Sequence, residues 1–337
     1  MIRRIAAAAL VLGLAGLLLV AAWPQLFALQ YAPVVAQVVS LRAVAAVAAF
    51  AGLVVVSLIA VVLPPFRRLG ASLAVLLVVF IAVSAAVLAT RGFGQEAADA
   101  ATDTDLTVLA WNTLGDAPGA DAIAELALEV EADIVALPET SQETAIEIAL
   151  IMKAAGRPMW VNTVALDQIS KAKSTSLLTS ADLGTYSIDS SMGNTSVVPS
   201  VVAVSDDGTG PRIVAAHPVA PIPGYLDAWR EDLEWVKRAC TGENIIIAGD
   251  FNSTIDHYGP LANSPSTTIG DCVDAAQSTG NAALGTWPTK IPAIFGSPID
   301  HVMATADWRA TSVRVIQDRD HLGSDHRPIV ARLTPAN

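Results

Sequence analysis

The first part of the chain is dominated by three long apolar segments. They cover about residues 5 to 22, 43 to 63 and 71 to 89. Each is close to the roughly 20 residues that a helix needs to cross about 30 Å of hydrocarbon. Because Arg3 and Arg4 precede the first segment, that segment alone could be a cleavable signal peptide, but two further segments of spanning length follow it. We therefore expect residues 1–91 to form a membrane domain with three transmembrane helices.

From residue 105 onward, short runs of β-branched residues alternate with stretches of helical periodicity. The predicted strands cover residues 106–111, 133–138, 174–179, 200–204, 212–217, 244–250, 299–304, 311–316 and 328–333, and the predicted helices cover residues 119–131, 141–155 and 225–240. These are many strands for one sheet. We therefore expect residues 105–337 to form an α/β domain, a four-layer α/β/β/α sandwich of two packed mixed sheets flanked by helices. The small, polar segment 92–104 is expected to be a linker.

Charge is distributed unevenly between these two parts. Residues 1–91 contain six arginines and no Asp, Glu or Lys, whereas the rest of the chain holds 14 basic and 32 acidic residues, a net charge of −18. Cytoplasmic loops of membrane proteins are enriched in basic residues. The segments that carry the arginine pairs Arg3–Arg4 and Arg67–Arg68 are therefore expected to lie in the cytoplasm. Three crossings then place the N-terminus in the cytoplasm and the acidic domain outside it, at the cell membrane.

Two cysteines, Cys240 and Cys272, both lie in the acidic domain. An extracytoplasmic compartment permits a disulfide between them, and two buried free thiols are the alternative. The chain has no CxxC or HExxH motif that would indicate a zinc site.

Polar side chains recur where the predicted strands of the acidic domain begin or end. They are Asn112, Glu139, His217, Asp250, Asn252, Asp300, Asp325 and His326. Strand ends at one rim of a sheet are where loops assemble sites. The motifs GDFN (249–252) and SDHRP (324–328) are the most informative, because neither is readily explained as a turn or a helix cap. Taken alone, Asn112 could be a turn residue and Glu139 a helix-start acid.

Three of these residues could hold a metal ion. Glu139, Asn112 and Asp325 offer the oxygen ligands that Mg²⁺ or Mn²⁺ prefers. A divalent ion would neutralise charge on the oxygens of a phosphoester and on its leaving group.

The other five residues could perform the chemistry of phosphoester hydrolysis. Asp250 could orient or deprotonate the attacking water, and Asn252 could hold the phosphate. Asp300 could pair with His326 and fix its tautomer, and His217 could donate a hydrogen bond to the phosphoryl oxygens or the leaving group.

Three further histidines are given no role at the site. On a strand, neighbouring side chains point to opposite faces, so only one of Asp300 and His301 is expected to face the site. His257 and His321 are interpreted as ordinary loop histidines.

The motifs WN, LPE, AAHPVAP, AGDFNST, SPIDHVMA and GSDHRPIVARL, in this order, resemble those of the endonuclease/exonuclease/phosphatase superfamily. The resemblance covers residues 106–333 and indicates a membrane-anchored bacterial member with a deoxyribonuclease-I-like fold. It implies Mg²⁺-dependent cleavage of a phosphoester. Carried over by position, it makes Glu139 the principal metal ligand, with Asn112 and Asp325 nearby.

The same resemblance assigns the remaining residues to catalysis. It implies that Asp250 activates or positions water, that Asn252 contacts phosphate and that Asp300 is the partner of His326. His217 corresponds to the histidine that many members place beside the phosphate. The segment from Lys171 to Val204 matches least, and it lacks the additional Glu, Tyr or Arg that some nucleases have.

The net charge of the acidic domain and its attachment to a membrane indicate the expected class of substrate. A net charge of −18 disfavours long nucleic acid, because nucleic-acid binding depends on basic contacts to phosphates. A site tethered at a membrane favours a phosphodiester or phosphomonoester on a lipid headgroup or another small molecule. An extracellular nuclease is the first alternative, and a non-catalytic membrane-bound binding module is the second.

Overall fold

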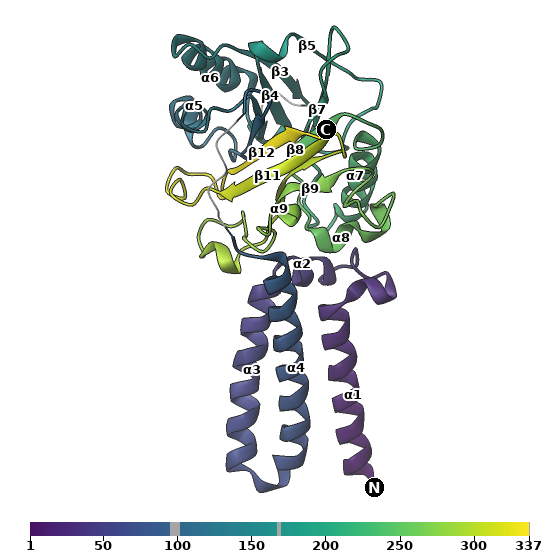
Figure 1. The fold of residues 1–337 in the computed structure, drawn as a ribbon. Helices are drawn as coiled ribbons and strands as arrows, with labels where there is room; N and C mark the ends of the chain where they lie inside the picture. Colours follow the sequence, from purple (N-terminus) through teal and green to yellow (C-terminus); the bar gives the residue numbers. More distant parts are fainter. Residues whose placement is uncertain (95–101, 167–169, 337) are drawn as a thin grey trace. The chain divides into compact units, whose positions relative to one another are not determined.

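The computed structural model describes residues 1–94, 102–166 and 170–336. The chain divides into two compact units, Met1–Arg91 and Gly92–Asn337 (Figure 1). Most of the segment predicted to be a linker, residues 92–104, lies outside the described residues.

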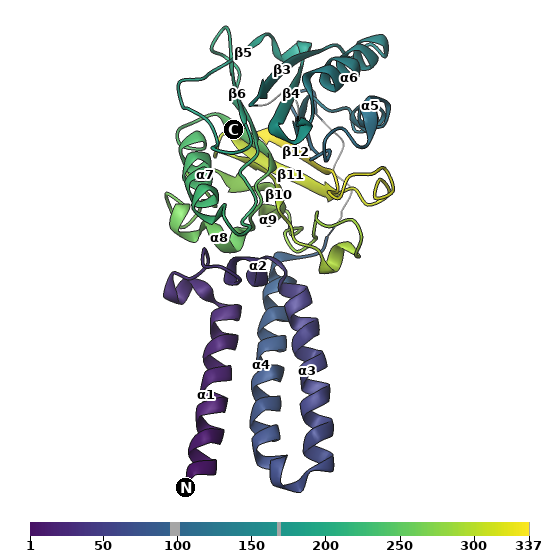
Figure 2. The same ribbon diagram turned by 180° about the vertical axis from the view of Figure 1, so that it is seen from behind.

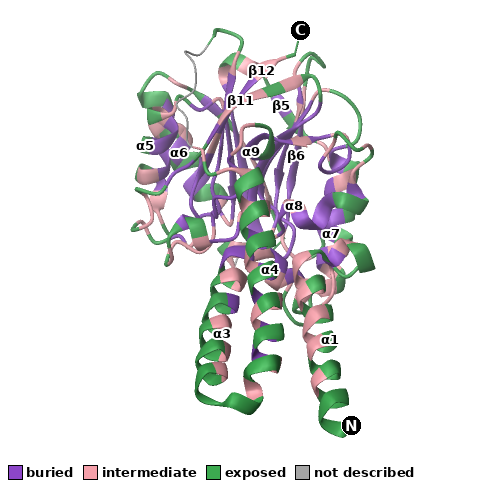
Figure 3. Ribbon diagram, turned by 60° about the horizontal axis from the view of Figure 1, so that its bottom comes forward, coloured by how far each residue is buried: buried purple, intermediate pink, exposed green. Residues whose placement is uncertain are grey.

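The first unit is entirely helical. It contains α1 (Ile2–Ala22), η1 (Pro24–Phe27), α2 (Val35–Ser40), α3 (Arg42–Val62), η2 (Pro64–Phe66) and α4 (Arg67–Arg91). Helices α1, α3 and the η2–α4 segment are long and apolar enough to cross a membrane, in agreement with the three apolar segments of the sequence. Their apolar side chains are largely exposed, as expected where lipid is the solvent (Figure 3). The short helix α2 was not predicted.

The second unit contains two six-stranded sheets. The first has the order β11-β12-β1-β2-β4-β3 and the second the order β5-β6-β7-β8-β10-β9. The strands are β1 (Leu106–Ala110), β2 (Ile134–Pro138), β3 (Met159–Ala165), β4 (Ser174–Ser180), β5 (Tyr186–Ile188), β6 (Val201–Ser205), β7 (Arg212–Ala216), β8 (Ile245–Asp250), β9 (Val273–Asp274), β10 (Asp300–Ala304), β11 (Trp308–Val315) and β12 (Ile329–Pro335). Each sheet contains both parallel and antiparallel pairs, so both are mixed.

Helices cover the outer faces of the two sheets. On the first sheet lie α5 (Gly119–Glu129) and α6 (Gln142–Ala154), and the opposite side of the sandwich carries α7 (Leu226–Ala239) and α8 (Ile255–Tyr258) (Figures 1 and 2). The short helix α9 (Ala275–Ser278) packs beside β10 and β11. The remaining turns are η3 (Lys171–Lys173), η4 (Ala181–Leu183), η5 (Gly259–Leu261) and η6 (Ala293–Phe295). The expected four-layer α/β/β/α sandwich is confirmed.

The two-residue period of the strands separates two hydrophobic cores. Along β1, Val108 and Ala110 face the second sheet, whereas Leu109 packs under α5 and α6 with Ile123 and Ile148. Both faces of this strand are therefore buried, which explains why its sequence is a continuous apolar run rather than an alternating one.

Strand register brings the polar strand ends to one rim. In the first sheet, Ala110 lies opposite Ile329, so the end of β1 meets the start of β12. In the second sheet, Asp300 lies opposite Asp250, so the start of β10 meets the end of β8. The loops that the sequence marked as functional therefore emerge together.

In the second unit, the sequence missed three strands and two α-helices. The edge strand β3 contains Asn162 and Thr163 and is only partly buried, so its pattern is not that of a core strand. Strands β5 and β9 have three and two residues, which are too few to show a period. Helices α8 and α9 have four residues each and are similarly invisible to periodicity.

Cys240 and Cys272 form a disulfide. Cys240 directly follows α7, and Cys272 precedes β9. Their Cα atoms lie 5.8 Å apart, and both side chains are fully buried. The bridge fastens the outer helix α7 to the segment that leads into β9.

Replacing both cysteines with alanine should lower the free energy of unfolding by roughly 3 to 4 kcal/mol. The bridge closes a loop of 32 residues, and opening it restores conformational freedom to the unfolded chain. Unfolding of the detergent-solubilised chain, with and without a reductant, measures the effect. A reductant should destabilise the wild type and leave the double variant unchanged; equal behaviour of the two proteins would contradict the prediction.

Candidate active site

All eight polar residues that the sequence singled out meet at one rim of the sandwich. Asn112 and Glu139 follow β1 and β2, and Asp325 and His326 precede β12, so these four come from the first sheet. His217, Asp250, Asn252 and Asp300 lie at the ends of β7, β8 and β10 in the second sheet. Neither sheet alone contains the site.

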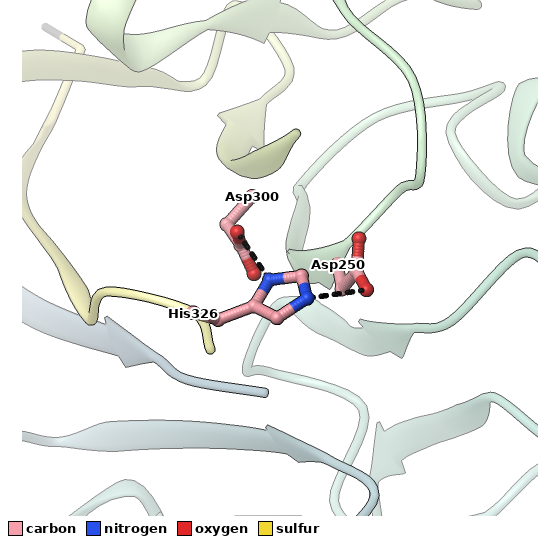
Figure 4. Close-up of side chains that lie close together, drawn as sticks. All are labelled: Asp250, Asp300 and His326. Atoms are coloured by element: carbon pink, nitrogen blue, oxygen red, sulfur yellow. Dashed lines mark hydrogen bonds and ion pairs between the residues drawn. The ribbon is translucent and has the colours of Figure 1, made fainter. Parts of the chain in front are cut away.

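His326 lies between two aspartates of the other sheet (Figure 4). Its Nδ1 is 2.9 Å from Asp300 Oδ2, and its Nε2 is 3.7 Å from Asp250 Oδ2. All three side chains are less than 10 % exposed. Burial alone would lower the pKa of His326, but the charges of Asp300 and Asp250 outweigh it and raise the pKa to about 10. His326 is therefore an imidazolium at neutral pH, a local positive charge rather than a neutral base.

Asn112 connects the two carboxylates that belong to different sheets. Its Nδ2 donates to Glu139 Oε1 at 3.1 Å and to Asp250 Oδ2 at 3.0 Å. Its Oδ1 accepts a hydrogen bond from the backbone N–H of Leu114 at 2.9 Å. The amide oxygen thus stabilises the turn after β1, and these contacts make Asn112 an orienting residue for the carboxylates. An amide oxygen has two lone pairs, so Oδ1 could also ligate a metal ion while it accepts from Leu114.

The GDFN turn holds Asp250 in a fixed orientation. Asn252 donates from its backbone N–H to Asp250 Oδ1 at 2.8 Å and from Nδ2 to the Pro218 carbonyl at 2.9 Å. Asn252 has φ of 46° and Glu139 has φ of 58°, in the left-handed region that non-glycine residues rarely adopt. Backbone strain of this kind concentrates at functional sites, where the surrounding contacts enforce it.

His217 differs from His326 in charge. It is 3 % exposed, its Nε2 lies 3.9 Å from Glu139 Oε1, and its Nδ1 has no hydrogen-bond partner among the described residues. Burial, helped by the positive charge of His326, lowers the pKa of His217 to about 3. This histidine is therefore neutral, with one N–H available as a donor.

The charge balance of the rim fits a divalent cation. Glu139, Asp250, Asp300 and Asp325 surround a single imidazolium, and burial raises the pKa of Glu139. Asp325 Oδ1 is buried without a hydrogen-bond partner in the part of the chain that the structure describes. Buried carboxylate oxygens are normally paired or bound to a metal. Glu139 and Asp325 could therefore hold the ion.

A second grouping of potential ligands is less suitable. Asp250, Asp300 and His326 offer atoms within 4.8 Å of one another. However, His326 Nδ1 is hydrogen-bonded to Asp300, so the ring could offer only Nε2 to an ion, and only after that nitrogen has lost its proton. These three residues are better suited to acid, base and electrostatic roles.

Two residues of the site were missed by sequence reasoning. Ser324 Oγ donates to the Asn112 carbonyl at 2.7 Å and accepts from the His326 N–H at 3.0 Å, so it joins the two loops of the first sheet. Trp287 donates from Nε1 to Asp325 Oδ2 at 2.9 Å. Ser324 stands inside the SDHRP motif, but Trp287 is 38 residues away and no local pattern links it to Asp325.

His301 points away from the site, as the period of the strand predicted. Its Nδ1 lies 2.6 Å from Asp274 Oδ2 and its Nε2 lies 3.0 Å from the Ser253 carbonyl. Both partners are acceptors, so both ring nitrogens must carry protons. Burial alone would lower the pKa of His301, but Asp274 raises it.

The expectation that His257 lies in a loop is wrong. It belongs to α8, is fully buried, and its ring nitrogen contacts the backbone of Thr254 at the start of that helix. A four-residue helix is too short for its capping pattern to be recognised in advance.

Two packed mixed sheets that bring carboxylates, amides and an imidazolium to one rim have the architecture of a metal-dependent phosphoester hydrolase. A model of the Endonuclease/Exonuclease/phosphatase family matches residues 109–326. The chain belongs to this family. A search of curated proteins gave no match.

Solved structures share the fold. The endonuclease/exonuclease/phosphatase from Bacteroides vulgatus is 18% identical, with a TM-score of 0.50 over 69% of this chain and 100% of that chain. Humanized D. rerio TDP2 is 16% identical, with a TM-score of 0.53 and the same coverage. D. rerio TDP2 complexed with single strand DNA product is also 16% identical, with a TM-score of 0.52 and again the same coverage. At these identities the likeness concerns the fold alone.

Replacing His301 with glutamine should destabilise the protein most at low pH. The pKa of His301 is raised in the folded chain. Its pairing with Asp274 therefore stabilises the fold fully below the unfolded-state pKa of about 6.5, and this stabilisation is lost as the pH rises through the folded-state pKa. Removing one partner of a buried charge pair costs about 3 kcal/mol. Unfolding midpoints between pH 5.5 and 9 measure this, with exposed His321→Gln as the matched control. A deficit that stays constant or grows with pH would refute the assignment.

Proposed function

We propose that this chain is a membrane-anchored, extracytoplasmic phosphoesterase that hydrolyses a phosphodiester or phosphomonoester on a lipid headgroup or another small molecule. The observation that carries the proposal is the hydrogen-bonded chain that runs from Glu139 through Asn112 to Asp250 and continues, across a 3.7 Å ion pair, to His326 and Asp300. It joins a candidate cation site to acid–base groups that come from both sheets.

The residues of the first sheet would hold the metal. Glu139 and Asp325 would bind Mg²⁺ or Mn²⁺, with Asn112 beside them, and the ion would supply positive charge to the phosphoryl oxygens and the leaving oxygen. Asn112 keeps the Glu139 carboxylate at a fixed distance from Asp250.

The residues of the second sheet, together with His326 of the first, would act on water and on phosphate. Asp250, held by Asn112 and Asn252, is placed to orient the attacking water and to accept its proton as the new P–O bond forms. The imidazolium of His326, held by Asp300, would stabilise the phosphoryl charge and protonate the departing alkoxide. Neutral His217 would donate a hydrogen bond to a phosphoryl oxygen, and Asn252 would contact the phosphate.

The surface around the rim favours a substrate at a membrane. Large apolar side chains are 42 to 50 % exposed in three loops of the site end: Leu114 after β1, Ile222 and Tyr225 after β7, and Ile294 before β10. Turns at the opposite end expose acids such as Glu131, Asp207 and Glu243 instead. An apolar rim suits contact with lipid, and the acidic domain opposes a long polyanion.

A nuclease is the second candidate. It is supported by the structural likeness to D. rerio TDP2, which was solved with a single strand DNA product. One fold can host several substrates, so the fold does not distinguish nucleic acid from a lipid phosphoester. We favour the lipid because the rim is apolar and the domain is acidic.

Assays of the full chain in detergent or nanodiscs should show metal-dependent cleavage of a lipid headgroup ester. The substrates would be sphingomyelin and phosphoinositide vesicles, a soluble chromogenic phosphodiester and plasmid DNA. EDTA and Asp250→Asn should each reduce the rate by at least about 100-fold, because acid–base catalysis contributes 10²–10⁴. Joint replacement of Ile222 and Tyr225 with serine should slow vesicle hydrolysis about tenfold and spare the soluble diester.

Other outcomes would change the assignment. Faster cleavage of DNA than of any lipid would establish the nuclease. A folded chain that binds a substrate but cleaves none with Mg²⁺ or Mn²⁺ would establish the binding module.

The proposed orientation can be tested independently of catalysis. The arginine pairs in the first turns of α1 and α4 favour a cytoplasmic position for these helix ends, and the Cys240–Cys272 bridge is consistent with an oxidising compartment for the second unit. An epitope tag added after residue 337 should be accessible to antibody on intact cells. A tag added before residue 1 serves as the control and should become accessible only after lysis; the reverse pattern would overturn the topology.

A further inference from the structure

Asp325 is held at both its side chain and its backbone by one segment of the loop before β10. The indole Nε1 of Trp287 donates to Asp325 Oδ2 at 2.9 Å, and the backbone N–H of Thr289 donates to the Asp325 carbonyl at 2.9 Å. We call residues 286–291 the strap. Its contacts with Asp325 leave the other carboxylate oxygen, Oδ1, buried and without a hydrogen-bond partner among the described residues, 3.9 Å from His326 Nε2.

A buried arginine fixes the conformation of the strap. The guanidinium of Arg327, 1 % exposed, donates to the carbonyls of Pro288 at 3.1 Å, Thr289 at 3.0 Å and Ile291 at 2.8 Å. Its charge is balanced by Asp320, whose Oδ2 lies 2.6 Å away. A guanidinium offers five N–H donors in a rigid plane, so it can hold several carbonyls at once in a way that an ammonium cannot.

The strap also contacts the second sheet. Thr286 Oγ1 accepts hydrogen bonds from the backbone N–H groups of Ile299 and Asp300, both at 3.2 Å. The Thr286 carbonyl accepts a hydrogen bond from the backbone N–H of Arg327 at 2.8 Å. One short segment therefore touches the start of β10, where Asp300 lies, and the start of β12, where Asp325 and His326 lie.

We propose that Trp287 is a positioning residue that sets the orientation of the Asp325 carboxylate for a divalent cation, with Arg327 holding the strap in place. The indole N–H is a donor only, so it binds Oδ2 and turns Oδ1 toward the site. Partners of this kind fix the geometry of metal-binding carboxylates, and their loss costs 10–100-fold in metal affinity. The inference rests on the proposed metal site at Glu139 and Asp325.

Binding of Mn²⁺ to the full chain in detergent, followed by the electron paramagnetic resonance signal of free Mn²⁺, tests the proposal without reference to catalysis. Trp287→Phe removes the N–H and keeps an aromatic ring, and it should weaken Mn²⁺ binding about tenfold. Arg327→Lys should weaken Mn²⁺ binding at least as much, because an ammonium cannot reproduce the planar fork that donates to three carbonyls and to Asp320 at once.

A matched control is available in the same domain. Trp308 Nε1 donates to Asn244 Oδ1 at 2.9 Å at the opposite end of the sandwich. Trp308→Phe should therefore leave Mn²⁺ affinity unchanged.

Each remaining outcome is decisive. Equal Mn²⁺ affinities of Trp287→Phe and Trp308→Phe would overturn the role of Trp287, and normal affinity of a folded Arg327→Lys chain would overturn the role of the strap. If Glu139→Gln binds Mn²⁺ as the wild type does, the metal site of the proposed function fails, and the role of Trp287 fails with it.

Discussion

The concentration of negative charge at the rim is the constraint on which the site depends. Four carboxylates of the two sheets converge there, and the described residues supply only one cationic side chain, His326, among them. Buried like charges of this kind are costly unless hydrogen bonds or a cation compensate them. The amides of Asn112 and Asn252, the indole of Trp287 and the imidazolium of His326 provide part of that compensation. A divalent ion would complete the compensation. Metal binding would therefore lower the electrostatic cost of bringing the four carboxylates together.

The contrast between His326 and His217 shows how position decides charge. Both rings are buried, but His326 lies between Asp300 and Asp250, whereas His217 has only a more distant carboxylate at 3.9 Å. Their pKa values consequently move in opposite directions, to about 10 and about 3. One buried histidine is a fixed cation and the other a neutral donor, a division of roles that their sequence contexts, AAHP and SDHR, do not reveal.

Much of the fold was predictable because core strands are apolar runs that end abruptly at polar residues. The strand that ends in Asp250 and the strand that begins at Asp300 were placed correctly, and with them the rim. The edge strand β3 could not be predicted, because its partly exposed side chains do not show the hydrophobic pattern on which the prediction rests. Trp287 could not be predicted for another reason: its importance arises from a contact across 38 residues. The different charges of His217 and His326, and the contacts of the Asn112 amide, likewise could be assigned only from the three-dimensional structure.

The core between the two sheets contains many alanines, among them Ala110, Ala136, Ala215 and Ala248 in the central strands. Small side chains there allow the sheets to approach closely, and since each sheet carries half of the site, this approach fixes the gap between Glu139 and Asp250. The interior of the sandwich therefore acts as a spacer for chemistry that takes place at its edge. Larger side chains at these positions would widen that gap, so these alanines influence the geometry of the active site although none of them belongs to it.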